Sequence, residues 1–200
     1  MTLKKKFTLG LTLIMLLALM VMGTYAYLTS TPETVSNTFT IGDIEITLDE
    51  SPVDEYGVVD ATVSGRVTEN DYKLVPGHTY VKDPTVHVLA DSEACWLFVK
   101  VEDELTAIED ATTIANQITA NGWTALGATY PGVYYKEQAA VTADTDVAVF
   151  ANFKVKSDAD LTNYNNKKID ITAYAIQKDG LSTAADAWTA VSAAASNTNP

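Results

Sequence analysis

Few residues in this sequence have types that could carry out chemistry, and their spacing matches no common catalytic motif. The two histidines, His78 and His87, are nine positions apart. A zinc protease of the H-E-x-x-H type needs two histidines one helical turn apart with a glutamate base, and that motif is absent. The two histidines could still meet across a hairpin beside an Asp or Glu. Structural or solvated roles are favoured, so we predict no catalytic residues, no metal and no cofactor.

The single cysteine, Cys95, lies inside the apolar run 94–99. A reactive thiolate needs a partner base and an electropositive setting, and neither is visible nearby. We therefore expect Cys95 to be a small buried hydrophobic residue. With one cysteine the fold contains no intramolecular disulfide.

Two pairs of aspartates, at 144 and 146 and at 158 and 160, have spacings found among calcium ligands. Neither pair continues into the Gly and terminal Glu of an EF-hand, so polar loop tips are favoured. A set of aromatic residues could line a carbohydrate groove, but their strand-like spacing favours the core. These residues are Trp96, Phe98, Trp123, Tyr134, Tyr135, Phe150 and Phe153.

The elements that carry these side chains are mainly short β-strands. Alternating apolar residues predict half-buried strands, and the run 96–101, apolar on both faces, predicts a central strand. Segment 79–89 is expected to be broken at Asp83-Pro84, because proline cannot donate to a ladder. The further expected strands are 34–41, 44–48, 58–68, 123–126, 132–137, 147–156 and 168–176.

Two segments have helical character. Apolar residues recur at helical spacing in 102–120, and Ser182 or Thr183 can cap a helix that ends near Ala194. Many short strands with one or two short helices predict a mainly β fold, a jelly-roll-like antiparallel β-sandwich. No repeat or linker divides the chain, so we expect one domain.

The N-terminal segment has the pattern of an export signal. Three lysines in the first six residues precede an apolar stretch, 11–22, interrupted only by Thr12. This stretch is shorter than the roughly 20 residues of a membrane span and is typical of a signal peptide. Small residues then predict cleavage between Ala26 and Tyr27. Residues 1–26 would be the signal peptide and 27–200 the mature domain; an uncleaved membrane anchor is the alternative.

The charge balance excludes one class of partner. The chain has 26 Asp and Glu residues against 13 Lys and Arg residues. An acidic surface repels phosphate backbones, which disfavours nucleic-acid binding. The composition instead suits a soluble secreted protein, located in the extracellular matrix or at the cell surface, that meets the membrane only through its uncleaved signal peptide.

Several segments resemble one known family. Gly-Thr-Tyr-Ala-Tyr at 23–27 and Ser-Asn-Thr-Phe-Thr-Ile-Gly at 36–42 look like the start of TasA and camelysin proteins. Those proteins are exported by Gram-positive bacteria and processed by a SipW-type signal peptidase. Further segments resemble TasA-like proteins in the same order along most of the chain; they are 73–77, 82–84, 97–101 and 173–177.

The resemblance implies a jelly-roll subunit of extracellular fibres in a biofilm matrix. Such subunits join head to tail by donor-strand exchange, in which the N-terminal segment of one copy completes a sheet of the next. The expected partners are further copies of the chain, a SipW-type signal peptidase and an accessory matrix protein. Camelysins were also described as metalloproteases, so the alternative is a cell-surface metalloprotease or a surface binding module.

Segment 27–41 is the candidate donor strand. Cleavage would free its end, and its apolar residues alternate, which lets one face enter a groove. Pro32 divides it, so the inserted part is either 27–31 or 34–41, with 27–31 favoured; 34–41 could instead be the first strand of its own sandwich. The candidate donor residues are Tyr27, Leu28, Thr29, Ser30, Thr31, Val35, Phe39 and Ile41.

Overall fold

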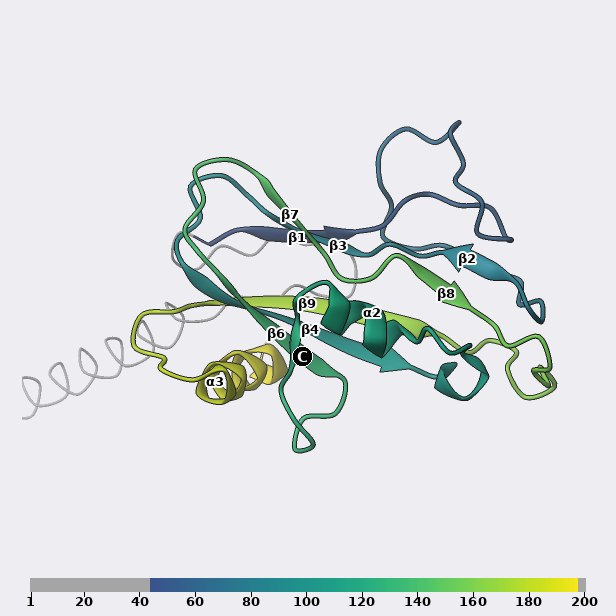
Figure 1. Cartoon of the computed structure of the whole chain (residues 1–200). Coiled ribbons are helices and arrows are strands. Elements are labelled where there is room, and N and C mark those ends of the chain that lie inside the picture. The colour runs from purple at the N-terminus through teal and green to yellow at the C-terminus, as the bar shows by residue number, and fades with distance from the viewer. Residues whose placement is uncertain (1–43, 198–200) are drawn as a thin grey trace, which may run out of the picture.

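Two antiparallel β-sheets face each other across a hydrophobic core in the computed structural model, which describes residues 44–197 (Figure 1). The prediction of a mainly β, antiparallel fold with one or two short helices is confirmed, while the jelly-roll connectivity stays a prediction. The first sheet has the order β5-β6-β4-β9, formed by Thr124–Ala125, Val133–Gln138, Cys95–Asp103 and Ile169–Gln177. The second has the order β1-β3-β7, formed by Ile46–Asp49, Thr85–Val88 and Thr145–Ala148, and a two-stranded part contains β2 (Thr79–Val81) and β8 (Asn152–Lys154).

The two-stranded part continues the second sheet. β2 leads into β3 along the chain, and β7 leads into β8 (Figure 1). Val81 pairs with Asn152, and Thr85 pairs with Ala148, so three residues separate the two halves on each side. The two halves therefore share one register across the interruption.

Pro84 explains where this ladder is interrupted. A proline has no backbone N–H, but its carbonyl accepts a hydrogen bond from the Val149 N–H at 2.9 Å, which keeps the strands aligned. The predicted break within 79–89 is confirmed. The predicted strand 147–156 is likewise divided into β7 and β8. Its partner is the segment from β2 to β3, which cannot continue the ladder of hydrogen bonds at Pro84.

Strand β4 separates two hydrophobic clusters. Cys95, Leu97 and Val99 point into the core between the sheets, while Trp96 and Phe98 point to the opposite face. This alternation follows from the two-residue period of a strand. The prediction of a central strand that is apolar on both faces is confirmed.

Helix α3 (Ala184–Asn197) covers that opposite face (Figure 1). The Thr183 hydroxyl caps it by accepting the Asp186 N–H at 3.2 Å, as the sequence predicts. Trp188 packs on Phe98 with ring centroids 5.4 Å apart. The four-stranded sheet is therefore covered on both faces.

The prediction of one helical segment over 102–120 is wrong in extent. β4 continues to Asp103, a single 3₁₀ turn follows at Thr106–Ile108, and only α2 (Ile114–Ala120) is α-helical. Between them the chain pairs with the second sheet, where the Asp110 N–H donates to the Lys154 carbonyl at 2.9 Å. This pairing replaces the hydrogen bonds that a continuous helix would need.

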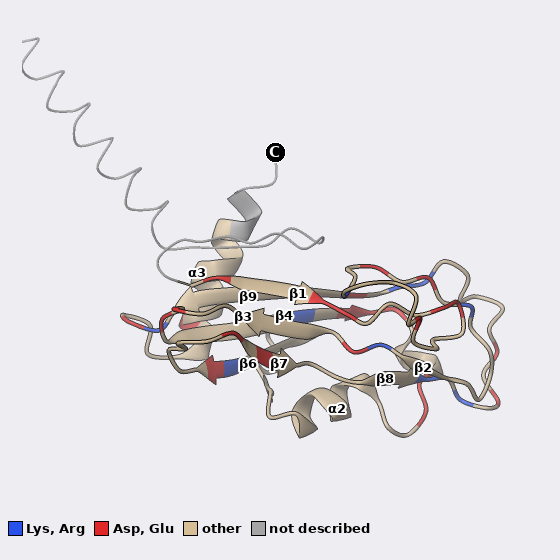
Figure 2. Ribbon diagram, turned by 90° about the horizontal axis from the view of Figure 1, so that it is seen from above, with Lys and Arg blue, Asp and Glu red and all other residues tan. Residues whose placement is uncertain are grey.

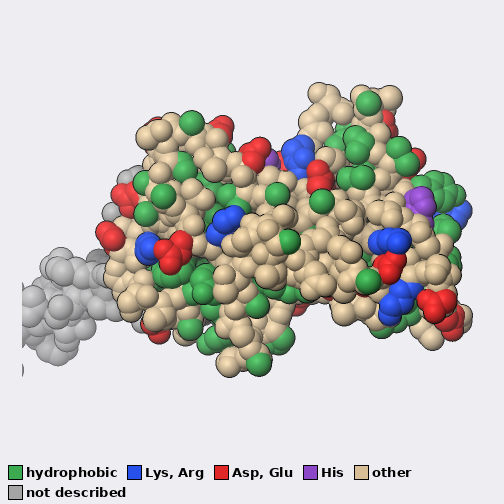
Figure 3. Space-filling view, viewed as in Figure 1, with side chains coloured by type: hydrophobic (Ala, Val, Ile, Leu, Met, Phe, Trp, Pro, Cys, Tyr) green, Lys and Arg blue, Asp and Glu red, His purple; other side chains and the backbone are tan. Residues whose placement is uncertain are grey.

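The predicted strand 58–68 is also wrong, since only isolated bridges form in the projecting segment 50–78. Val58 is 60% exposed, so no second layer covers the apolar side chains that Figure 3 shows on this projection. Gly57 turns the chain at φ +72°, and a Cβ there would lie 2.6 Å from the Tyr80 Cα. The segment is therefore shaped by close packing at its base, and β propensity does not decide its structure.

Several predictions lie outside the described residues. They are the signal peptide 1–26, the cleavage site between Ala26 and Tyr27, the donor segment 27–41 and the strand 34–41. Within 44–197, no helix has the length and apolar character needed to cross a bilayer. Charged residues in this part lie mainly in loops and at strand ends (Figure 2).

Candidate functional site

The two sheets meet along a seam between β1 and β9, whose Cα atoms approach within 8 Å (Figures 1 and 2). Within residues 44–197, β1 pairs only with β3 and β9 pairs only with β4. No ladder joins β1 to β9. The seam is therefore the place where two strand edges face each other without pairing.

The register of β9 shows which backbone groups point into the seam. Hydrogen bonds from Glu104 N to Lys168 O and from Lys178 N to Ala94 O, both 3.0 Å, flank the β4–β9 ladder. In an antiparallel pair the direction of bonding alternates. The even-numbered residues of β9 thus bond to β4, and the N–H and C=O groups of its odd-numbered residues point away. These residues are Ile169, Ile171, Ala173, Ala175 and Gln177.

The edge of β1 also has backbone groups that point into the seam, over a shorter length than the edge of β9. The Leu89 N–H donates to the Glu45 carbonyl at 2.9 Å, which fixes the alternation of the β1–β3 ladder. The backbone groups of Ile46 and Leu48 consequently point away from β3. Beyond them Glu50 exchanges two backbone hydrogen bonds with Val67, of 2.7 and 2.8 Å, which ends the open part of this edge.

The opposite edge of the second sheet is covered instead. Trp123 donates its indole N–H to the Ala148 carbonyl at 2.9 Å, and Asn121 donates to the Val149 carbonyl at 3.0 Å. Gln117 bonds to both backbone groups of Asn152, at 2.8 and 3.2 Å. Side chains around α2 thus occupy the hydrogen-bonding positions that a further strand would use, which blocks edge pairing there.

A cleft of about 760 Å³ opens at the end of the seam. One wall is the projecting segment 68–74, and the other is the loop 161–168 with the start of β9. Glu50 at the end of β1 and Ile169 at the start of β9 both line it, so the cleft is continuous with the seam. Its lining combines apolar rings with charged groups; the rings are those of Tyr72, Tyr80, Phe153 and Tyr164.

Arg66, the only arginine in the sequence, ties the projecting segment to the sheet where β1 and β3 separate. Its Nε donates to the Asp49 carboxylate, and its Nη2 donates to the Asp83 carbonyl at 2.8 Å and to Thr85 Oγ1 at 3.1 Å. The Asp83 carboxylate also accepts the N–H and the hydroxyl of Ser51, each at 2.7 Å. Side chains thus replace the ladder bonds that β1 and β3 no longer make.

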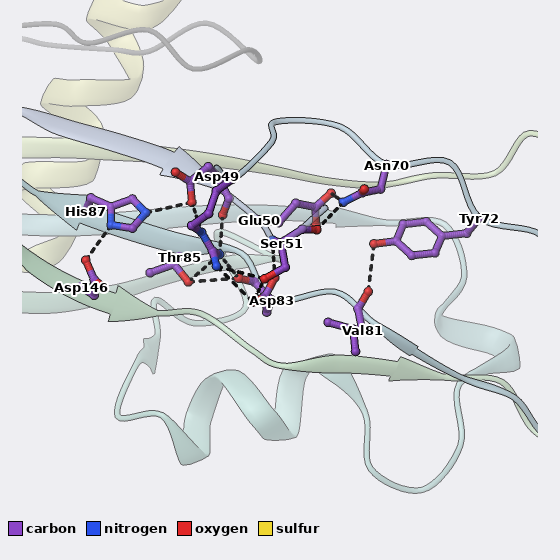
Figure 4. A network of polar contacts seen from close by, with 11 residues as sticks. Asp49, Glu50, Ser51, Asn70, Tyr72, Val81, Asp83, Thr85, His87 and Asp146 are labelled. Atoms are coloured by element: carbon purple, nitrogen blue, oxygen red, sulfur yellow. Dashed lines mark hydrogen bonds and ion pairs between the residues drawn. The ribbon is translucent and has the colours of Figure 1, made fainter. Parts of the chain in front are cut away.

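His87 extends this network along β3 (Figure 4). Its Nε2 lies 2.8 Å from Asp49 Oδ1 and its Nδ1 lies 2.6 Å from Asp146 Oδ1. Burial alone would lower the pKa of His87, but the hydrogen bonds and charges of Asp49 and Asp146 outweigh it and raise the pKa above 6.5. The arrangement favours an imidazolium ion between two carboxylates.

The structure does not bring the two histidines together. The nine-residue path through β2 and β3 is nearly extended, which places His78 and His87 roughly 30 Å apart at about 3.3 Å per residue. His78 Nε2 instead lies 2.7 Å from the Tyr56 carbonyl oxygen. Among residues 44–197, no three His, Cys, Asp or Glu side chains gather as a metal ligand set.

The other sequence candidates have structural positions. Cys95 is fully buried, and burial raises the pKa of its thiol to about 12, as expected for a small core residue. Asp144 accepts the Ala90 N–H at 2.9 Å, and Asp160 accepts the Thr162 N–H at 3.0 Å, so both organise loops. The aromatic set is buried in the two clusters, apart from the half-buried Tyr134 and Tyr135.

Sequence reasoning missed the residues that define this site. The open edges of β1 and β9 depend on which strands pair, and no local pattern contains that information. Only Arg66 gave a weak signal, since it is a charged residue inside the β-leaning run 58–68.

Comparisons with known proteins identify no relative, because no family model, curated protein or solved structure matches this chain.

Proposed function

We propose that this protein is a secreted structural subunit that assembles head to tail into extracellular fibres. The observation that carries the proposal is the seam between β1 and β9, where two strand edges that pair with no other strand of residues 44–197 meet beside an open cleft. The resemblance of the leader junction and of later segments to TasA-like proteins supports the same function.

An extended segment from another copy would enter the seam from the cleft. Ile171, at that end of β9, is half-buried, whereas Ala173 and Ala175 are 1% and 2% exposed. The incoming strand would bond to the outward groups of β9 first and would displace the contact between β1 and β9 as it advanced. Such β-augmentation derives its affinity from backbone hydrogen bonds and its specificity from alternate side chains.

The covered edge of β7 and β8 supports a single direction of growth. A subunit with one open edge and one free donor segment makes a heterologous contact, which generates a filament when it does not close into a ring. Because side chains around α2 cover the edge of β7 and β8, addition of a strand at that edge of the second sheet is disfavoured.

Two variants with complementary defects test the proposal. Deleting 27–31 removes the favoured donor but leaves the seam able to accept. Ile171→Pro removes an outward N–H of β9 without removing a hydrogen bond to β4. This variant can therefore donate its N-terminal segment to another copy, but its own seam accepts a donor strand poorly. Each variant alone should be a folded monomer by circular dichroism and size exclusion.

Mixing the two variants should give a one-to-one complex, while the unaltered protein forms filaments visible by electron microscopy. Filaments of normal morphology from the deletion variant would rule out the favoured donor segment. Normal filaments from Ile171→Pro, or from a matching Leu48→Pro variant in β1, would show that the seam is not the acceptor.

A further inference from the structure

The side chains of Asn70 and Lys82 meet at the buried carboxylate of Glu50 in the wall of the cleft. Glu50 is 5% exposed. Its Oε2 accepts a hydrogen bond from Lys82 Nζ, and its Oε1 accepts one from Asn70 Nδ2, both at 2.9 Å (Figure 4 shows Glu50 and Asn70). An amine and a primary amide are therefore held on the two oxygens of the same carboxylate.

The orientation of the Asn70 amide is fixed by three partners. Its Nδ2 donates to Glu50 and also to the Ser51 carbonyl at 2.9 Å, and its Oδ1 accepts the Val53 N–H at 3.0 Å. The opposite assignment of nitrogen and oxygen would place donors against donors and acceptors against acceptors. The Val53 N–H therefore polarises the amide carbonyl and can stabilise negative charge on its oxygen.

The Lys82 side chain is shielded from solvent beside Glu50. Its side chain is 12% exposed, and the Glu50 side chain is 7% exposed. The Lys82 Nζ lies 5.6 Å from the centre of the Tyr72 ring, which is positioned by the hydrogen bond from its hydroxyl to the Val81 carbonyl at 3.1 Å. Glu50 is the hydrogen-bonded acceptor for a proton from Lys82, and a lysine amine that has transferred its proton is a nucleophile.

We propose that Lys82 and Asn70 form an intramolecular amide cross-link, with Glu50 as the proton carrier. Glu50 takes a proton from the Lys82 ammonium, and Nζ attacks the amide carbon of Asn70 while the electron pair moves to Oδ1. Glu50 then delivers that proton to Nδ2, and the bond from the amide carbon to Nδ2 breaks as the electron pair on Oδ1 re-forms the carbonyl. Glu50 carries a second proton from Nζ to the released ammonia, which leaves through the cleft as ammonium. Of the three protons of the Lys82 ammonium, one therefore stays on the new amide nitrogen and two leave on Nδ2. No oxidant, cofactor or second enzyme is needed.

The other lysine–carboxylate pairs show why this one is distinct. Lys154 with Asp110, and Lys178 with Glu137, have both side chains at least one-third exposed. The hydrogen bonds of these two pairs include no side-chain amide on the same carboxylate. They serve as matched controls, and the proposal is independent of fibre assembly.

The consequence of the reaction would be a closed loop of residues 70–82 at the base of the projecting segment. A covalent loop closure restricts the unfolded chain and stabilises the fold. It would also fix one wall of the cleft relative to the second sheet.

Peptide mapping of the full chain, recovered after export, tests the proposal whatever its N-terminus. Trypsin should release residues 67–73 joined to 74–100, with Lys82 uncleaved and a mass lower by one ammonia than the two peptides combined. The joined peptide should be absent from Glu50→Gln and from Lys82→Arg, which keeps the positive charge. It should persist in Lys154→Arg.

Circular dichroism establishes whether each variant is folded. If Glu50→Gln does not fold, the Lys82→Arg variant still tests the proposal. Release of free 67–73, 74–82 and 83–100 from folded, unaltered protein would overturn the proposal. So would a joined peptide of undiminished yield in folded Glu50→Gln.

Discussion

Replacing Arg66 by alanine tests whether one guanidinium holds the projecting segment 50–78 on the sheet. The change removes the ion pair with Asp49 and the hydrogen bonds to the Asp83 carbonyl and to Thr85 Oγ1. It leaves the carboxylates of Asp49 and Asp83 facing each other without the cation between them. We expect the free energy of unfolding to fall and the segment to open.

The magnitude follows from the number and the exposure of these contacts. A hydrogen bond to a charged group contributes about 1.5–3 kcal/mol, but these bonds share one guanidinium and are not additive. The Arg66 side chain is 30% exposed, so solvent screens part of the charge. We therefore expect a loss of about 2–4 kcal/mol, which lowers the melting temperature by roughly 5–15 °C in a domain of this size.

Urea unfolding at neutral pH, followed by tryptophan fluorescence, measures this loss. Lys167→Ala is the matched control, because its ion pair with Glu104 has side chains 41% and 47% exposed, so solvent screens the pair and its loss should change the free energy of unfolding far less. An Arg66→Ala variant no less stable than the Lys167→Ala control would refute the reasoning.

A pH series adds an independent readout of the same change. Burial would raise the pKa of Asp83, but hydrogen bonds from Ser51 and the charge and hydrogen bond of Arg66 outweigh it and lower the pKa below 3.8. The lowered pKa of Asp83 stabilises the fold at pH values above 3.8, and this stability is lost as the pH falls through the pKa of Asp83 in the folded protein. The difference between Arg66→Ala and the unaltered protein should therefore narrow at the acidic end.

Three further predictions concern other parts of the chain. Because the pKa of His87 is raised, its stabilisation is present below pH 6.5 and lost as the pH rises through the folded pKa; His87→Gln should abolish this dependence in urea unfolding. Trp123→Phe leaves the Ala148 carbonyl without its indole donor and should cost about 2–4 kcal/mol; a loss below about 0.5 kcal/mol would contradict the role of this bond. N-terminal sequencing of secreted protein should begin at Tyr27, and a start beyond Thr31 would refute the cleavage site.

The parts of the fold that sequence predicted well are those decided by local pattern. β4 was evident because its run is apolar on both faces, and both faces are buried. α3 was evident because Thr183 caps an alanine-rich segment. Pro84 was recognised as an interruption because the missing N–H is a property of the residue itself.

The parts that sequence did not predict depend on contacts between distant residues. The segment 102–120 has helical spacing. However, the hydrogen bond from the Asp110 N–H to the Lys154 carbonyl places part of it against the edge of β8. The group of Glu50, Asn70 and Lys82 spans more than thirty positions and is assembled where the projecting segment returns to the end of β1, beside the bridge between Glu50 and Val67. The seam likewise exists only because β1 and β9 belong to different sheets.

The shared register of the interrupted ladder restricts how the chain length can change. Three residues separate β2 from β3, and three separate β8 from β7. Losing one residue from either gap would shift one half of the ladder by one position and turn its core side chains outward. A compensating loss from the other gap would restore the pairing of β2 with β8, but it would leave the core side chains of both strands on the outer face, because successive side chains alternate between faces. Only matched changes of two residues in 82–84 and in 149–151 keep both the pairing and the core faces, so the two gaps behave as one unit of length variation.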